Sequence, residues 1–281
     1  MSSDRPFELM GVINVTPDSF SDGGRYLDRA KAIEHGLELE AEGATVLDVG
    51  GESTRPGAAP VGRDEELARV LPVIEGLVAR GTAARISIDT YKAAVAGAAL
   101  AAGASLVNDV TALRGDPAMA GLLAGAGVDC CLMHMLGEPR TMQDDPRYDD
   151  VVSEVKAFLE ARMAFAVSEG VAEGRILLDP GIGFGKTLAH NLELLRRLDE
   201  LVALGRPLVI GTSRKSFLGR ITGRSDPQQR LGGTIATNLL AYLKGARVFR
   251  VHDVAPVHDA LAVAAATVPA PWRTTPTSST K

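Results

Sequence analysis

The sequence predicts an α/β fold, and within that class a TIM (β/α)8 barrel folded as a single domain. The prediction rests on eight short apolar runs that recur at intervals of roughly 20 to 40 residues along the 281-residue chain. Runs this short, bounded by Gly, Asp or Asn, are typical of parallel strands that are buried on both faces. In chain order, the expected strands are residues 10–13, 46–49, 86–88, 106–107, 130–133, 176–178, 208–210 and 248–251.

Stretches of helical periodicity separate these runs. In residues 65–80, the side chains of Val70, Ile74 and Leu77 fall on one face, which is the spacing of an amphipathic helix. A doubly wound sheet shares the alternation of strand and helix, but eight units fit the size of a barrel better. The expected helices are residues 30–42, 65–80, 151–169, 191–204, 229–245 and 256–266.

The two ends of the chain differ in composition from the middle. Residues 1–8 form a polar lead-in, and no composition break marks a second domain within 9–267. Residues 268–281 are rich in Pro, Thr and Ser, so we expect a disordered tail there.

The overall composition excludes several classes of protein. A content of 46% hydrophobic and 23% charged residues excludes wholesale disorder. A net charge of −5 and only 4% aromatic residues argue against nucleic-acid binding. No apolar run approaches the roughly 20 residues of a membrane span, and we expect no membrane association. The two cysteines, Cys130 and Cys131, are adjacent and are expected to pack in a core strand of a cytoplasmic protein.

Polar residues follow the expected strands at their carboxyl ends. In a TIM barrel the active site lies at that face, so these residues are candidates for function, although any one of them could serve a structural hydrogen-bond network. They are Asn14, Asp48, Asp89, Asn108, Asp109, His134, Asp179, Ser213, Lys215, Arg250 and His252.

Their chemistry indicates an anionic, phosphorylated ligand with a polar ring. Cationic side chains gather in the loops after strands two, seven and eight, and the last two loops are a common phosphate site in this fold. Asn14 offers a hard oxygen to Mg²⁺, which often arrives with a substrate phosphate. Asp89, Asn108 and Asp179 could bind a flat heterocycle rich in N–H groups. The cationic residues are Arg55, Arg214, Lys215, Arg250 and His252.

Three loops need an interpretation of their own. Residues 180–187, PGIGFGKT, nearly spell a nucleotide-binding P-loop, but Pro180 replaces its first glycine. We interpret this stretch as a turn whose glycines allow positive φ angles. Residues 15–24 and 50–58 are polar and rich in turn-forming residues, yet they carry Phe20 and Arg55, which favours two lids over the barrel mouth.

Eight segments in order resemble the bacterial dihydropteroate synthases, and together they span residues 10–254. Cobalamin-dependent pterin methyltransferases share the general site, but are not expected to carry STRPG and SRKSFLG together. The segments are MGVINVTPDSFSDGG (10–24), DVGGESTRPGA (48–58), SIDTYK (87–92), VNDV (107–110), LMHMLGEPRTMQ (132–143), LDPGIGFGKTLAHN (178–191), GTSRKSFLG (211–219) and RVHDV (250–254).

The resemblance implies the enzyme that joins 6-hydroxymethyl-7,8-dihydropterin pyrophosphate to p-aminobenzoate, giving 7,8-dihydropteroate and pyrophosphate in folate synthesis. It also implies a Mg²⁺ cofactor, inhibition by sulfonamides and a homodimer. The expected mechanism is SN1-like, with loss of pyrophosphate before the arylamine attacks. A corrinoid-linked methyltransferase, a non-catalytic pterin-binding paralogue and an unrelated phosphate-binding barrel stay open as alternatives.

Residue roles follow from the same resemblance. On the first lid, Asp22 would lie near the reacting centre, and Thr54, Arg55, Lys215, Arg250 and His252 would complete the catalytic set. The pterin would be bound by Asp89, Asn108, Val110, Met133, Asp179, Lys215 and Arg250. The p-aminobenzoate pocket would be formed by Phe20, Thr54, Arg55, Pro56, Phe184, Lys215 and Ser216. Pyrophosphate would be bound by Asn14, Arg250 and His252, with Asn14 also the ligand of Mg²⁺.

Overall fold

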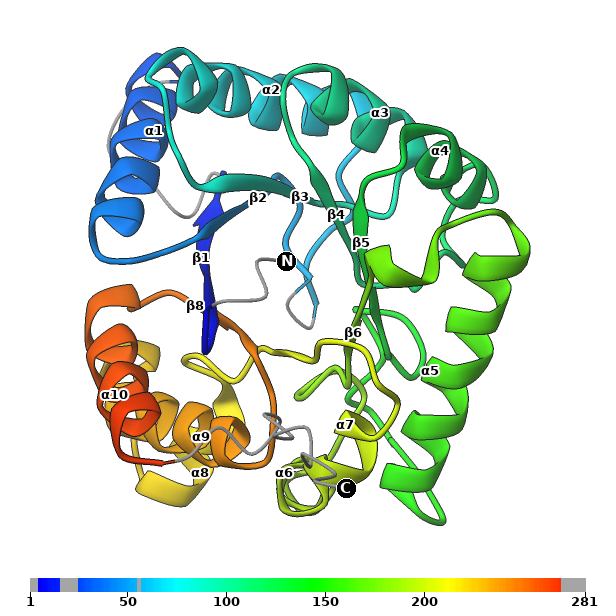
Figure 1. Cartoon of the computed structure of the whole chain (residues 1–281), viewed down its shortest axis with the longest axis vertical. Helices are drawn as coiled ribbons and strands as arrows, with labels where there is room; N and C mark the ends of the chain where they lie inside the picture. Colours follow the sequence, from blue (N-terminus) through cyan, green and yellow to red (C-terminus); the bar gives the residue numbers. More distant parts are fainter. Residues whose placement is uncertain (1–4, 16–24, 55–56, 269–281) are drawn as a thin grey trace, which may run out of the picture.

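Eight parallel strands form a barrel that is surrounded by helices, as a computed structural model of the chain shows (Figure 1). The structure describes residues 5–15, 25–54 and 57–268. The strands are β1 (Glu8–Asn14), β2 (Val46–Gly50), β3 (Arg85–Asp89), β4 (Leu106–Asp109), β5 (Asp129–Met133), β6 (Ile176–Asp179), β7 (Val209–Ile210) and β8 (Val248–Val251).

The pairing of the strands confirms the predicted barrel and excludes the doubly wound sheet. The hydrogen-bonded order is β6-β5-β4-β3-β2-β1-β8-β7, so the first strand lies between the second and the last. A parallel bridge between Leu178 and Leu208 joins β6 to the start of β7. The ring of strands is thereby closed, as a TIM barrel requires.

Helices cover the outside of the barrel (Figure 1). They are α1 (Arg25–Ala41), α2 (Arg63–Ala79), α3 (Ala93–Ala101), α4 (Met119–Ala126), α5 (Val151–Ser168), α6 (Leu188–Arg196), α7 (Leu198–Val202), α8 (Ser216–Thr222), α9 (Leu231–Leu243) and α10 (Val254–Thr267), with short 3-10 turns at η2 (Glu173–Arg175) and η3 (Pro227–Arg230).

The helices differ from the sequence prediction in two ways. The predicted helix at 191–204 is two helices, α6 and α7, because the backbone leaves the helical region at Arg197, where φ is −107°. Helices α3, α4 and α8 were not predicted: α8 has only seven residues, and the α3 and α4 sequences AAVAGAALA and MAGLLAGA are built almost wholly of small and apolar residues. Such sequences have no polar face, so they lack the periodicity that reveals an amphipathic helix.

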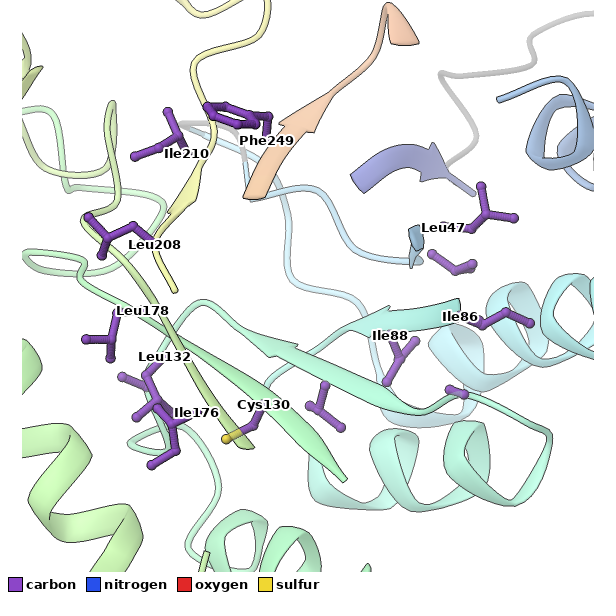
Figure 2. Packing of buried hydrophobic residues seen from close by; sticks show 14 of the residues in the cluster. Leu47, Ile86, Ile88, Cys130, Leu132, Ile176, Leu178, Leu208, Ile210 and Phe249 are labelled. Atoms are coloured by element: carbon purple, nitrogen blue, oxygen red, sulfur yellow. The ribbon is translucent and has the colours of Figure 1, made fainter. Parts of the chain in front are cut away.

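The strands alternate between two cores. Side chains such as Met10, Val46 and Cys131 form a cluster inside the barrel, whereas their neighbours Leu47 and Cys130 belong to the larger core against the helices. Figure 2 shows that outer packing at Leu47, Ile88 and Leu132. Both cysteines are free and buried, which fits their predicted place in a core strand. The two-residue period decides which polar side chains enter the barrel.

The amino-terminal end of the barrel is closed by charged side chains. Arg85 donates to Asp129 at 2.6 Å and to Glu8 at 3.1 Å, and Arg175 donates to Asp129 at 3.1 Å. We call these four residues the floor network. Glu8 therefore belongs to β1, although the sequence placed it at the end of the polar lead-in.

Two contacts lie near the limits of the described residues. Within the lead-in, Phe7 packs edge-on against Tyr242, with ring centroids 6.3 Å apart. At the other end, the amide of Val268 donates to Ala264 at 2.9 Å. The predicted tail from residue 269 onward lies outside the described residues, as does most of the first predicted lid.

Candidate active site

Arg250 is the centre of a partly buried ion-pair network at the carboxyl end of the barrel. Its Nε donates to Asp48 Oδ2 at 2.6 Å, and its Nη2 donates to Asp89 Oδ2 at 2.7 Å. Asn108 donates to the same Asp48 oxygen at 3.1 Å. These residues come from β8, β2, β3 and β4, so the fold brings together groups that are up to 202 positions apart.

Asp48 has a larger part in this network than the sequence analysis gave it. It was noted at a strand end but given no role, because the motif containing it drew attention to Thr54 and Arg55. The available signal was the two-residue period, since Asp48 lies in phase with inward-facing Val46. Its side chain is fully buried, and Oδ1 accepts no hydrogen bond from the described residues. A buried carboxylate oxygen of this kind is available to a ligand or a bound water.

Asp179 and Lys215 form the opposite side of the site. Asp179 ends β6, and its Oδ1 accepts a hydrogen bond from the Gly181 amide at 2.6 Å. Lys215 follows β7, and its Nζ donates to the Ile182 carbonyl. The same Nζ lies 4.2 Å from the centroid of the Phe184 ring, a cation–π contact. The loop after β6 therefore positions the lysine through both its backbone and an aromatic side chain.

Burial shifts the charges of these groups. It raises the pKa of Asp89 to about 7, although Arg250 opposes the shift and Asp48 adds to it. Burial likewise raises the pKa of Asp179, against the opposing charge of Lys215. It lowers the pKa of Lys215 to about 7, although Asp179 partly restores it. Burial opposes the charge of Arg250 as well, yet Asp48 and Asp89 raise its pKa above the usual value. Burial thus shifts the pKa values of Asp89 and Lys215 toward neutral pH, from opposite sides.

Apolar side chains form a compact wall beside the charged groups. Val110 and Met133, both predicted to contact the ring, are buried in one cluster with Met135 and Met142. Phe184 packs against this cluster and so links it to Lys215. Thioether and branched side chains of this kind suit the face of a flat ring.

The loops after β7 and β8 hold His252 in place. Ser213 Oγ lies 3.2 Å from the His252 amide, which donates to it, and 3.0 Å from His252 Nδ1. Arg214, grouped with the phosphate-binding cations in the sequence analysis, instead pairs with Asp253 at 2.5 and 2.9 Å. Its backbone is left-handed, with φ of 59°, and its carbonyl accepts a hydrogen bond from Arg230 at 2.8 Å. Ser216 begins α8 and is exposed.

The predicted lids are only partly within the described ranges. Phe20, Asp22, Arg55 and Pro56 lie outside the described residues, so their predicted roles stay predictions. Thr54 is half-buried at the edge of the second loop.

An ion-pair network anchors that second loop. Lys92 donates to Glu66 at 2.5 Å and also to Glu52, whose other oxygen accepts from the Val61 amide at 3.2 Å. This network ties the loop that carries Thr54 to α2 and to the segment before α3.

Asn14 lies at the carboxyl end of β1, paired in register with Gly50 of β2. Among the described residues no group of three or more His, Cys, Asp or Glu side chains could hold a metal ion by itself. A Mg²⁺ ion that takes one protein oxygen and completes its shell with water and phosphate needs no such group.

The glycine-rich loop at 180–187 is a turn, as predicted. Gly181, Gly183 and Gly185 have φ angles of 65°, 86° and 63°. A Cβ atom at Gly181 would lie 1.8 Å from the His134 carbonyl oxygen, so only glycine fits there.

None of the helices in the described ranges combines the length and apolar character needed to cross a membrane.

Comparison with known proteins identifies the family of the chain. The family described as pterin binding enzyme matches residues 10–252. The dihydropteroate synthase of Mycobacterium leprae is 50% identical over 267 residues, which cover 93% of each chain.

Two solved structures extend the likeness to three dimensions. A Xanthomonas albilineans dihydropteroate synthase with 4-aminobenzoic acid has a TM-score of 0.88 at 51% identity and covers 95% of each chain. The Yersinia pestis dihydropteroate synthase with a sulfonamide drug complex has a TM-score of 0.89 at 44% identity, covering 95% of this chain and 96% of the other. The chain belongs to the pterin binding enzyme family, and within it to the dihydropteroate synthases.

Proposed function

We propose that the mouth of this barrel binds 6-hydroxymethyl-7,8-dihydropterin pyrophosphate and p-aminobenzoate and joins them into 7,8-dihydropteroate. The observation that carries the proposal is the partly buried network in which Arg250 bridges Asp48 and Asp89, opposite Asp179 and Lys215. This arrangement combines a polar ring site with cations for a phosphorylated tail.

The pterin occupies the deep part of the mouth. Its aminopyrimidine edge has N–H groups. The carboxylates of Asp89 and Asp179 and the side-chain carbonyl of Asn108 can accept hydrogen bonds from them. The ring lies against the buried wall of Val110 and Met133. Lys215, held over Phe184, supplies a donor to the ring acceptors.

The pyrophosphate is bound nearer to the surface. Arg250 uses Nε and Nη2 for its two carboxylates, so Nη1 is the nitrogen that neither ion pair uses. His252, oriented by Ser213, lies two residues after Arg250, just beyond the end of β8. These two groups and Asn14 therefore form the proposed pyrophosphate site, with Asn14 as the protein ligand of Mg²⁺. When bound, Mg²⁺ would supply positive charge that makes pyrophosphate a better leaving group.

The proposed chemistry is SN1-like. The bond between the pterin methylene carbon and the pyrophosphate oxygen breaks, and its electron pair leaves with pyrophosphate. Arg250 and His252 stabilise the departing anion, while Asp89 and Asp179 stabilise the positive charge that spreads over the pterin ring. The arylamine nitrogen then bonds to the methylene carbon and releases a proton. A weak nucleophile such as an arylamine benefits from this order, because it attacks a carbon that is already electron-poor.

The arylamine is proposed to bind between the second loop and the start of α8. Phe184 and Lys215 form one side of this pocket, and Thr54 and Ser216 lie around it. We assign Phe20, Arg55 and Pro56 to the same pocket and Asp22 to the reacting centre, on the motif match alone. Sulfonamides resemble p-aminobenzoate, so we propose that they compete for this pocket.

The assembly is proposed to be a homodimer. Ile221 of α8 and Leu240 and Leu243 of α9 are exposed apolar side chains on neighbouring helices, which suits burial against a second copy. The proposed compartment is the cytoplasm, where the free thiols of Cys130 and Cys131 stay reduced.

Pyrophosphate release tests the proposed function directly. Purified protein is given the pterin pyrophosphate and Mg²⁺, with and without p-aminobenzoate. We expect release that depends on p-aminobenzoate and falls at least about a hundredfold in Lys215→Ala, because the variant loses the cation beside Asp179. Pterin binding without release would contradict synthase activity and leave a binding paralogue or a methyltransferase.

A further inference from the structure

Lys186 is a buried lysine that no part of the proposed reaction uses. Its side chain is 3% exposed. Its Nζ lies 2.9 Å from His134 Nδ1 and donates to the Phe184 carbonyl at 3.0 Å. A buried ammonium group is costly unless its hydrogen bonds are satisfied, so these contacts call for an explanation.

His134 connects Lys186 to the strands that carry the site. The His134 amide donates to the Asp179 carbonyl at 2.9 Å, just beyond the end of β5. Its ring packs edge-on against Phe158, with centroids 4.8 Å apart. Lys186 therefore spans from this packed histidine to the middle of the loop after β6.

Electrostatics set the charge of the histidine in this contact. Burial lowers the pKa of His134 to about 2, and the neighbouring Lys186 adds to the shift. His134 is therefore neutral, and its Nδ1 shares one hydrogen bond with Lys186 Nζ. Burial also lowers the pKa of Lys186 well below the usual value, while Asp179 opposes that shift and Lys215 adds to it.

The loop that Lys186 holds carries the aromatic side of the site. Phe184 provides the ring under Lys215 Nζ, and Ile182 provides the carbonyl to which Lys215 donates. On its far side the loop is held by Asn191, whose Oδ1 accepts from the Gly183 amide at 2.7 Å. The loop is also held by Tyr148, whose hydroxyl donates to the Gly185 carbonyl at 2.8 Å, and by Gln143, which donates to the Gly183 carbonyl at 2.5 Å. Lys186 is thus the buried, inner contact among several that hold the segment around Phe184.

We propose that Lys186 is a positioning residue that clamps the Phe184 loop to His134 and thereby shapes the arylamine side of the active site. The expected effect on kinetics rests on the proposed function. The expected effect on the order of the loop does not depend on it. Asp179 ends a strand and is held separately by Gly181, so the clamp affects the pterin side less.

Lys186→Met tests the clamp because methionine keeps an unbranched side chain out to the ε position and removes the ammonium donors. We expect the KM for p-aminobenzoate to rise about tenfold, with kcat and the KM for the pterin pyrophosphate within about threefold. Equal losses for both substrates would overturn the proposal, because they would place the effect on Asp179 or on the fold as a whole.

Lys186→Gln is the matched variant, since an amide keeps donors for His134 and Phe184 but carries no charge. We expect it to recover most of the p-aminobenzoate affinity. A glutamine variant as impaired as the methionine variant would overturn the clamp in favour of a purely electrostatic role.

Amide hydrogen exchange provides a readout that needs no turnover. In Lys186→Met, the amides of residues 182–185 should exchange at least about tenfold faster than in the parent, while those of β1 to β4 stay unchanged. Unchanged exchange in the loop would overturn the proposal even if activity fell.

His134→Phe is the second variant if the methionine variant does not fold. It keeps an aromatic ring and removes Nδ1, so amide exchange in residues 182–185 should be faster by the same amount. A parent protein that lacks synthase activity would contradict the proposed function while leaving this exchange result to decide the clamp.

Discussion

The two ends of the barrel use the same ionic groups in opposite ways. At the floor, Glu8 and Asp129 face Arg85 and Arg175, and each carboxylate is held by a guanidinium at 2.6 to 3.1 Å. At the mouth, Arg250 pairs with Asp48 and Asp89 at 2.6 and 2.7 Å, whereas Asp179 is influenced by the charges of Lys215 and Lys186 without a direct ion pair to either among the described residues.

The difference lies in what each end leaves unsatisfied. The floor matches two acids with two bases, so it closes the barrel without a ligand. The mouth has a buried Asp48 oxygen without a partner in the described residues and an Asp89 whose pKa is raised to about 7 by burial. Active sites commonly keep such groups at the expense of stability, because a bound substrate satisfies them. The comparison therefore predicts that equal lesions at the two ends have unequal effects.

Arg250→Met should produce the largest effect. It leaves Asp48 and Asp89 buried without their shared cation and removes the proposed pyrophosphate donor. We expect kcat/KM to fall by about 10³-fold, together with a loss of about 3 kcal/mol in the free energy of unfolding. Steady-state kinetics and urea unfolding measure the two quantities. Activity within tenfold of the parent would contradict the assignment of the mouth as the reacting site.

Arg85→Met makes the same substitution at the floor. Glu8 loses its partner, whereas Asp129 keeps Arg175. Because Arg85 is 30% exposed, water screens part of the loss, and we expect destabilisation of about 1–2 kcal/mol. The kcat/KM should stay within about threefold of the parent. A loss of activity comparable with that of Arg250→Met would show that the two ends are not functionally separate.

The barrel itself could be predicted because its eight strands are short, apolar and separated by segments long enough to hold a helix. A fully buried strand needs apolar residues on both faces, and the eight runs have them. Helices α3 and α4 could not be found in the same way, because almost every residue in them is small or apolar. Their helical state is set by packing against the barrel rather than by an amphipathic pattern.

The mouth was predictable to the extent that topology alone determines it. Asp89, Asn108, Asp179 and Arg250 follow or end their strands, and parallel strands bring such positions to one end. Lys186 could not be recognised from sequence, since its partner His134 lies 52 positions away and both depend on burial for their state.

A sharper test of the comparison is the pH dependence of stability in Asp89→Asn. The folded-state pKa of Asp89 is raised to about 7, whereas an unfolded aspartate titrates near about 3.9. Between these values the folded state holds a proton that the unfolded state has lost. The free energy of unfolding contributed by Asp89 therefore falls as the pH rises from about 4 to 7.

Asparagine cannot ionise, so the Asp89→Asn variant escapes this loss, and its side-chain carbonyl can still accept a hydrogen bond from Arg250. We expect the stability of Asp89→Asn relative to the parent to increase between pH 4 and pH 8 in urea titrations, by at most about 4 kcal/mol, because the shift spans roughly three pKa units and each unit corresponds to about 1.4 kcal/mol. A difference that stays flat or falls with pH would mean that Asp89 is ionised and stably paired at the mouth, as the carboxylates of the floor are paired, and the contrast between the two ends would then rest on Asp48 and Asp179 alone.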